Sequence, residues 1–294
     1  MRWLLLLPLL VACSSAPAPV APSPARPQAW LTRLDAEHPL VGKIWSVREA
    51  RFVTEPEMLA KLEGRVLLGE KHDNADHHRL QAQVLGALVK KRPVVAFEML
   101  EQAQQPAIDA ARKEAPHDAQ HLATAVAWDK SGWPAFSLYA PVVQAALDAD
   151  LPIVGTGIPR RKPGTPAPAL DTGAPLSPDD ERSLTEELRE SHCGKLPEEH
   201  LPKMIAMQRA RDTAMAKAMV AAPSGVLIAG TGHTRKDRGA GRDIPGAWSV
   251  AFAEVDRTKP DPAAYASRWN TTKLPFDYVW FTPRANDDDP CAGM

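Results

Sequence analysis

RVLLGEKH, at residues 65–72, is a short apolar run that ends in glycine and is followed at once by charged side chains and a histidine. Three further stretches are similar, namely PVVAF at 93–97, LPIVG at 151–155 and GVLIAG at 225–230. Continuous apolar runs of this length, bounded by glycine or proline, are typical of strands that are buried on both faces of a sheet. We therefore expect four central strands at these positions.

Segments with helical periodicity separate the predicted strands. In residues 76–91, Leu80, Val84 and Leu88 recur every fourth position, which places them on one face of a helix. Strands that alternate with helices predict an α/β fold with a mainly parallel mixed sheet, helices on both faces and a helical insertion. The other expected elements are an edge hairpin at 43–53, strands at 247–255 and 278–282, helices at 102–113, 117–128, 135–149, 178–191 and 197–222, and a long loop at 160–178.

Polar side chains and glycines follow the predicted strands. The first and fourth strands each end in a Gly-x-x-His motif, at 69–72 and 230–233, while the second ends at Glu98. Because parallel neighbours bring their carboxyl ends to one edge of a sheet, where open α/β folds bind ligands, we expect these groups to line one cleft. The candidate catalytic residues are Glu70, His72, Glu98 and His233, and the first candidate ligand-binding residues are Gly69, His72, Gly155, Gly157, Gly230 and His233.

Each of these residues also has a structural interpretation. A single histidine at a strand end is usually structural, and Glu98 is either the orienting partner of a histidine or a polar strand end, since a lone buried carboxylate is costly. If both histidines line a cleft, His72→Ala and His233→Ala should impair the same activity and leave the fold intact. His77 and His78 are further candidate ligands, but adjacent helical positions diverge by about 100°, so we expect at most one to reach the cleft.

The helix predicted at 197–222 carries two patterns. Gln208 and Asp212 are four residues apart, so they share one face, and both are candidate ligand-binding residues. Met207, Met215 and Met219 also lie at multiples of four. We expect this stripe to be a core face, and the alternative is an adaptable wall for a flat apolar ligand. Earlier in the chain, Trp128 and Trp133 flank a short loop that is either tucked into the core or at the rim of the cleft.

The N-terminus indicates export and lipidation. An apolar run at 3–11 precedes Cys13 and is shorter than the roughly 20 residues that cross a bilayer. This pattern resembles the lipobox of bacterial lipoproteins, with an ordinary secretory signal as the alternative. We expect a signal peptide at 1–12, a lipidated Cys13 with a Pro/Ala-rich tether at 13–40, and a single domain at 41–294. The expected location is the cell envelope, facing the periplasm or the surface, with the outer membrane favoured over the inner.

The charge balance bears on possible binding partners, and the cysteine content bears on disulfide formation. Lys and Arg number 35 against 36 Asp and Glu, for a net charge of −1, so we expect no nucleic acid partner. Once Cys13 is lipidated, Cys193 and Cys291 remain as an even pair in an oxidising compartment. We predict a disulfide between them, with two free thiols as the alternative.

Taken in order, the motifs resemble ChaN, a family of haem-binding iron-uptake lipoproteins in the Tiki superfamily. The resemblance implies a cell-envelope lipoprotein that binds haem, with a homodimer holding haem between subunits as one arrangement. The axial ligand stays open, because none of Tyr139, Tyr265 and Tyr278 can be matched to the family's haem ligand, and the absence of Cys-x-x-Cys-His excludes covalent attachment. The resemblance is carried by GEKHDN at 69–74, HH at 77–78, FEM at 97–99, the helix at 208–215 and GTGH at 230–233.

Three hypotheses about function remain. In the first, the protein is a haem-binding module in iron acquisition. In the second, it is a hydrolase of the Tiki-protease or esterase-like kind, in which His72, His233 and Glu98 hold a divalent metal, or the histidines act as general bases with Glu98 or Glu70. In the third, it is a non-catalytic envelope protein, which would leave the clustered histidines and carboxylates unexplained. The residue types favour the second hypothesis and the resemblance favours the first. Whether the protein is an enzyme is therefore not decided by the sequence.

Overall fold

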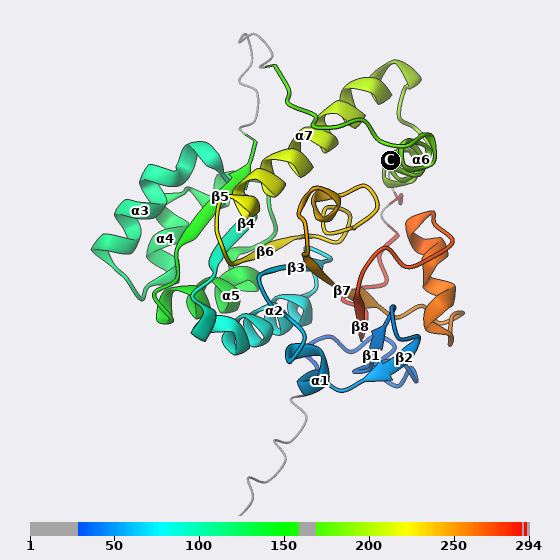
Figure 1. The fold of residues 1–294 in the computed structure, drawn as a ribbon, viewed down its shortest axis with the longest axis horizontal. Helices are drawn as coiled ribbons and strands as arrows, with labels where there is room; N and C mark the ends of the chain where they lie inside the picture. The colour runs from blue at the N-terminus through cyan, green and yellow to red at the C-terminus, as the bar shows by residue number, and fades with distance from the viewer. Residues whose placement is uncertain (1–28, 159–168, 290, 293–294) are drawn as a thin grey trace, which may run out of the picture.

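The computed structural model describes residues 29–158, 169–289 and 291–292. In this part of the chain one mixed sheet has the strand order β2-β1-β8-β7-β3-β6-β4-β5 (Figure 1). The strands from β8 to β5 are parallel, whereas β1 is antiparallel to both β8 and β2. The predicted α/β fold is confirmed. The strands are β1 (Ile44–Ser46), β2 (Arg51–Val53), β3 (Arg65–Glu70), β4 (Val94–Glu101), β5 (Ile153–Gly157), β6 (Gly225–Gly230), β7 (Trp248–Glu254) and β8 (Tyr278–Thr282).

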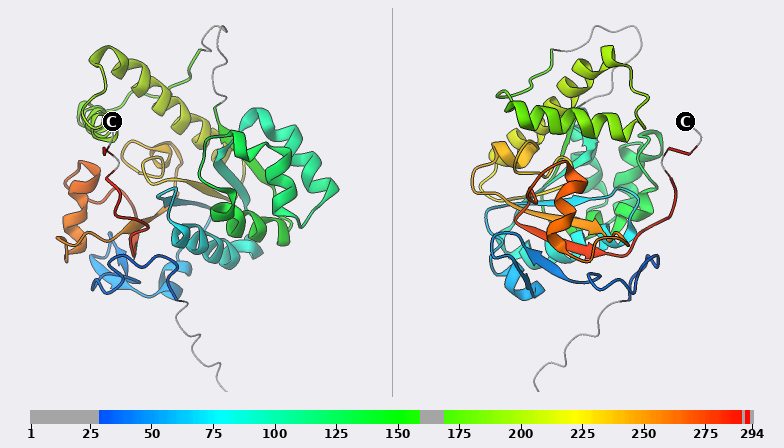
Figure 2. Two further views of the ribbon diagram at one scale, coloured as in Figure 1. Left: turned by 180° about the vertical axis from the view of Figure 1, so that it is seen from behind. Right: turned by 90° about the vertical axis from the view of Figure 1, so that its right-hand side faces the viewer.

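Helices cover both faces of the sheet (Figures 1 and 2). On one face α2 and α5 pack over alternate side chains of the central strands, including Val66, Leu68 and Phe97. The intervening side chains, such as Leu67 and Leu227, face α7 on the other side. The α-helices are α1 (Glu55–Leu59), α2 (Ala75–Leu88), α3 (Gln105–Glu114), α4 (Ala119–Ala125), α5 (Phe136–Asp148), α6 (Pro178–Ser191) and α7 (Leu201–Val220).

Local sequence explains where several of these elements begin and end. Helix α6 occupies the predicted range 178–191, because Ser177 caps it by accepting from the Asp180 backbone N–H and Pro178 stands in its first turn. Strand β6 likewise has the predicted bounds. Strand β4 is longer than predicted and shifts register between Phe97 and Glu101, which places Glu98 within the strand. The 3-10 helix η6 (Pro262–Trp269) was not predicted from the sequence.

The folded part of the chain begins earlier than the expected residue 41. The backbone N–H groups of Leu31 and Thr32 both donate to the Asp76 carboxylate, at the start of α2. Leu34 forms a bridge with Arg284, and Leu40 is buried. Residues 29–40 therefore belong to the domain and not to the tether. The signal peptide, Cys13 and the tether up to residue 28 lie outside the described residues, as does part of the predicted loop, 159–168.

The predicted disulfide is present in the structure. Cys193, just after α6, pairs with Cys291 near the C-terminus, across a sequence separation of 98 residues. The bond connects the C-terminal segment to the end of α6, and Ser191 in that helix lines the cleft described below. The disulfide therefore restrains one wall of the cleft.

The disulfide predicts a simple labelling result. Alkylation of the unfolded protein without reductant should modify neither Cys193 nor Cys291, because both thiols are consumed in the bond. After reduction both should be modified, as peptide mass spectrometry would show. Modification of both without reductant would mean that the pair is free in the mature protein.

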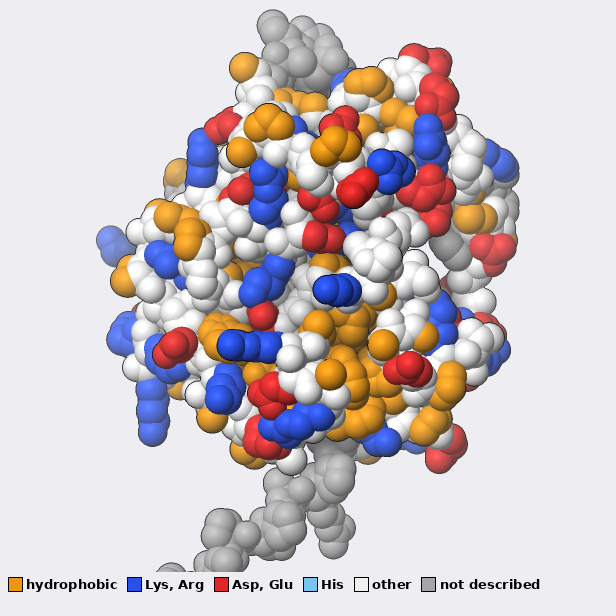
Figure 3. Space-filling view, turned by 45° about the vertical axis from the view of Figure 1, so that its right-hand side comes forward, with side chains coloured by type: hydrophobic (Ala, Val, Ile, Leu, Met, Phe, Trp, Pro, Cys, Tyr) orange, Lys and Arg blue, Asp and Glu red, His pale blue; other side chains and the backbone are white. Residues whose placement is uncertain are grey.

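Two further observations concern the hydropathy of the helices and the distribution of charge on one face of the protein. Among residues 29–158, 169–289 and 291–292, no helix is both long and apolar enough to cross a bilayer. On the face shown in Figure 3, basic and acidic side chains are interspersed. This mixture agrees with the near-zero net charge of the sequence.

Candidate functional site

The two Gly-x-x-His motifs meet in one cleft. Strand β3 lies between β7 and β6, and β4 follows β6, so the motifs and Glu98 come from three adjacent strands. The register pairs Glu70 with Gly230, which brings the two strand ends level with each other. The cleft measures about 440 Å³. Its lining includes Glu70, Lys71, His72, Gln208, Gly230 and His233.

His72 is held by a buried carboxylate and presents one free nitrogen. Its Nδ1 lies 2.8 Å from Oε1 of Glu70, and the hydroxyl of Tyr139 donates to the same oxygen at 3.1 Å. Trp133 contacts the imidazole edge to face, with ring centroids 4.8 Å apart. Within the described residues Nε2 has no hydrogen-bonding partner, and the side chain is one-third exposed. The contact with Glu70 therefore fixes the orientation of the imidazole, and its Nε2 atom remains free of hydrogen bonds among the described residues.

The charge state of this group follows from its neighbours. Burial disfavours the carboxylate of Glu70, but His78 and His72 outweigh burial and hold its pKa far below the usual range. Burial also disfavours the imidazolium of His72, yet the hydrogen bond to Glu70 leaves its pKa raised. Desolvation and the Glu70 charge together raise the pKa of Tyr139, so the phenol stays protonated. Glu70 is thus an anion that is hydrogen-bonded to His72 and Tyr139 and lies within ion-pair distance of His78.

His233 sits between two carboxylates and is itself buried. Its Nδ1 is 2.7 Å from Oδ1 of Asp212, and its Nε2 is 3.2 Å from Oε1 of Glu98. The amide nitrogen of Gln208 lies 3.2 and 3.3 Å from the two ring nitrogens. The second oxygen of Glu98 accepts the backbone N–H of Gly230 at 2.8 Å. Because both ring nitrogens face carboxylate acceptors, the imidazole is doubly protonated.

The pKa values of this second group agree with an imidazolium. Burial opposes the charge on His233, but Glu98 and Asp212 outweigh it and raise its pKa to about 10. In turn, despite burial, His233 lowers the pKa of Glu98 to about 2. For Asp212, burial prevails and its pKa is raised. With both nitrogens occupied, His233 is a fixed positive charge in the wall of the cleft and has no free ring nitrogen for a ligand.

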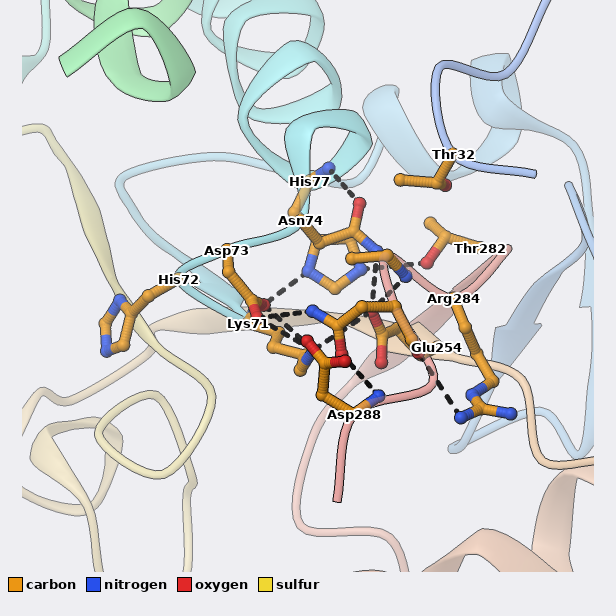
Figure 4. Close-up of polar contacts among 12 residues, drawn as sticks. Thr32, Lys71, His72, Asp73, Asn74, His77, Glu254, Thr282, Arg284 and Asp288 are labelled. Atoms are coloured by element: carbon orange, nitrogen blue, oxygen red, sulfur yellow. Dashed lines mark hydrogen bonds and ion pairs between the residues drawn. The ribbon is translucent and has the colours of Figure 1, made fainter. Parts of the chain in front are cut away.

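His77 and His78 have supporting positions. His77 accepts the backbone N–H of Lys71 at 2.9 Å and pairs with the hydroxyl of Thr282 at 2.8 Å, so it is turned away from His72 (Figure 4). Burial keeps the pKa of His77 well below its usual value, so it is neutral. His78 is 2.8 Å from the second oxygen of Glu70. His77 belongs to the lining of the cleft and His78 does not, in agreement with the expectation that at most one of them reaches it. In this conformation all their ring nitrogens are engaged within the protein, so neither offers a free nitrogen to a ligand.

Two of the four candidate glycines let the histidine turns approach each other. A Cβ at Gly69 would lie 2.2 Å from the hydroxyl oxygen of Thr234 and 3.1 Å from the Thr231 backbone. A Cβ at Gly230 would lie 3.0 Å from Nε2 of His72. These glycines are needed for close packing of the two strand ends.

The other two glycines lie away from the cleft, which corrects their prediction as ligand-binding residues. A Cβ at Gly155 would lie 2.5 Å from the carbonyl oxygen of Glu101, and one at Gly157 would lie 2.7 Å from that of Glu98. Both glycines allow β5 to pack against the irregular part of β4. Their role is in the sheet.

The structure also adds residues that sequence reasoning missed or left open. Tyr139 was noted only as a tyrosine, and no local signal connects it with Glu70, which is 69 residues away. Trp128 is buried in the core while Trp133 contacts His72, so both alternatives for this loop are partly right. Among the methionines, Met215 and Met219 are core residues, whereas Met207 lines a surface groove.

The arrangement has one feature relevant to metal binding. In the described residues, no group of three or more His, Cys, Asp or Glu side chains is placed to hold a metal ion by itself. The His72 Nε2 atom can supply a single ligand to an iron whose other ligands come from a macrocycle. As a base, the same atom can instead accept a proton.

Comparison with known proteins gives a family match and a match to a solved structure. The family described as haem-binding uptake, Tiki superfamily, ChaN matches residues 59–244. A search of curated proteins finds no match. Among solved structures, cofacial haem-bound ChaN of Campylobacter jejuni is 23% identical with a TM-score of 0.63, covering 81% of this chain and 95% of that one.

Two other solved structures are less similar. A type III effector is 15% identical with a TM-score of 0.45, covering 77% of this chain and 91% of its own. An erythromycin esterase in its open conformation is 13% identical with a TM-score of 0.43, covering 79% and 93%.

Proposed function

Because the chain belongs to the ChaN family of haem-binding uptake proteins in the Tiki superfamily, we propose that it binds haem noncovalently in the cleft, with Nε2 of His72 as the iron ligand. The observation that carries this proposal is the pairing of His72 with Glu70 at 2.8 Å, which leaves the other ring nitrogen of this cleft-lining side chain without a hydrogen-bonding partner among the described residues. Imidazoles that bind metals commonly donate their second N–H to a carboxylate, which fixes the ring and increases its basicity.

The rest of the cleft lining is partly apolar and partly basic. Phe252 and Trp269 belong to it but are only 1% and 7% exposed, whereas Arg268 is an exposed cation there. None of the three tyrosines is available as a ligand without rearrangement, because each is at most 3% exposed. His72 must be neutral at Nε2 to ligate iron, and its pKa is raised. Haem affinity should therefore fall as the pH is lowered.

The test is a haemin titration of the mature chain, residues 13–294, with Cys13→Ser to prevent lipidation. We expect a saturable, shifted Soret band for this protein and its loss or a shift toward free haemin for His72→Ala. His117→Ala is the matched control, because that imidazole is 67% exposed and remote from the cleft lining. An identical Soret band for His72→Ala and the parent would exclude His72 as the ligand.

A second candidate function is ester hydrolysis in the same cleft. It is favoured by the buried imidazolium of His233 and by the oriented, one-third exposed His72, which line the same cleft. Neutral His72 would take a proton from water as the oxygen attacks an ester carbonyl, and would return it to the departing alkoxide, giving acid and alcohol. Turnover of a chromogenic ester that is lost in His72→Ala, by a protein without a haem band, would favour this function over the first.

We further propose that the protein is an envelope lipoprotein attached through Cys13, which lies outside the described residues. The support is the apolar run at 3–11 followed by a small-residue site before the cysteine. Cys13→Ser in the full chain should abolish fatty-acid labelling and shift the protein from the membrane to the soluble fraction, since two or more acyl chains give stable attachment. Unchanged labelling and fractionation would contradict this proposal.

A further inference from the structure

A second, mainly apolar groove adjoins the cleft. It measures about 290 Å³ and lies between the C-terminal half of α6 and the first turns of α7. Leu188 belongs to its wall, and Met204 and Met207 face it from α7. Gln208 lines both the groove and the cleft. The two hollows therefore meet at this one side chain, next to His233.

The groove is bordered by positive charge. Lys203 and Arg211 are exposed members of its lining, and within the described residues neither makes an ion pair or a side-chain hydrogen bond. Unpaired cations beside an apolar wall complement a ligand that is itself apolar with carboxylates at its edge. Thioether side chains suit such a wall because they are flexible and polarizable and adapt to a flat surface.

We propose that this groove binds the apolar edge and the carboxylates of a porphyrin that extends from the cleft past Gln208. The inference rests on the proposed haem-binding function and specifies where the rest of the ligand lies. Lys203 and Arg211 pair with the two carboxylates, and Met204 and Met207 contact the ring edge. The porphyrin thus uses two sets of residues, one for the iron and one for the periphery.

Metal-free protoporphyrin IX tests the groove independently of the iron ligand. Its binding to the Cys13→Ser mature chain is followed by fluorescence. Lys203→Gln with Arg211→Gln should weaken binding roughly threefold to tenfold, as expected for two exposed ion pairs. Met207→Asp, which places a carboxylate on the apolar wall, should weaken it more than tenfold. Lys90→Gln with Lys113→Gln removes the same charge from exposed positions outside the groove and is the control.

The dimethyl ester of protoporphyrin IX separates charge from apolar contact. It should bind the parent and the Lys203→Gln, Arg211→Gln variant equally, because it has no carboxylates. In the His72→Ala background, Lys203→Gln with Arg211→Gln should still weaken binding of metal-free protoporphyrin IX roughly threefold to tenfold, so failure of iron ligation and failure of the groove are distinguishable. Equal binding of protoporphyrin IX by the parent, the Gln double variant and Met207→Asp would overturn the proposal, as would an equal loss in the control.

Discussion

His233→Ala is expected to destabilise the folded protein by about 3 to 5 kcal/mol, the range for removing one partner of a buried ion pair. The imidazolium is almost fully buried and is the shared counterion of Glu98 and Asp212, at 3.2 and 2.7 Å. Without it, two buried carboxylates lose their positive partner, and one must be protonated or admit water. This result reverses the sequence-based expectation that the substitution leaves the fold intact.

Urea denaturation of the parent and the variant measures this difference directly. His121→Ala serves as the control, because its side chain is 39% exposed and we expect a change of no more than about 0.5 kcal/mol there. A loss below about 1 kcal/mol for His233→Ala would show that the charge cluster is not what stabilises this edge of the sheet.

The same variant shows how the His233 imidazolium makes the free energy of unfolding depend on pH. The folded-state pKa of His233, about 10, lies above its ordinary value of 6.5, so its stabilisation is complete below pH 6.5 and is lost as the pH rises through 10. Glu98 has the opposite dependence, because its pKa is lowered from 4.5 to about 2: its stabilisation is present above pH 4.5 and is lost as the pH falls through 2. The alkaline loss should be absent from His233→Ala.

Glu70→Gln is expected to weaken haem binding about 10-fold to 100-fold, the usual cost of removing the partner that orients a metal ligand. The amide keeps the size of the side chain but removes the negative charge that His72, His78 and Tyr139 share. The pKa of His72 should fall as well, because Glu70 raises it more than Glu98 does.

Two measurements separate these effects. Haemin titration gives the affinity, and NMR titration of the His72 ring gives its pKa. Glu63→Gln, at an exposed position just before β3, is the matched control. An unchanged His72 pKa in Glu70→Gln would contradict the pairing of these two residues. A lowered pKa with unchanged haem affinity would agree with the pairing but would contradict the assignment of His72 as the iron ligand.

Much of the fold could be predicted from the sequence because its signals are local. The central strands are continuous apolar runs bounded by glycine or proline, and β6 and α6 have the predicted bounds. The convergence of the two Gly-x-x-His motifs follows from parallel strands in one sheet, and the structure brings His72 and His233 into the lining of one cleft.

The roles within the cluster could not be predicted, because they depend on burial and on partners far apart in the chain. Nothing local distinguishes His72, which has a free nitrogen, from His233, which lies between Glu98 and Asp212. Asp212 was a candidate through its helical spacing from Gln208, but its contact with His233 arises only when α7 packs on the sheet. Gly157 resembled a ligand-binding turn, although its requirement comes from the β4 backbone beside it.

The placement of β3 between β6 and β7 has a consequence for the time course of folding. The hydroxyl of Thr231 donates to the Glu70 carbonyl across 161 residues, so the two halves of the cluster are synthesised far apart. Contacts between such distant segments are slow to form, because a long loop must close before they contribute. Glu70 and His72 therefore lack their contacts with β6 and Thr231 until that strand has been synthesised and packs against β3. A nascent chain that stops before residue 225 would hold the carboxylates Glu98 and Asp212 without His233, and β3 without either neighbouring strand, which makes this stage the one most exposed to misassociation.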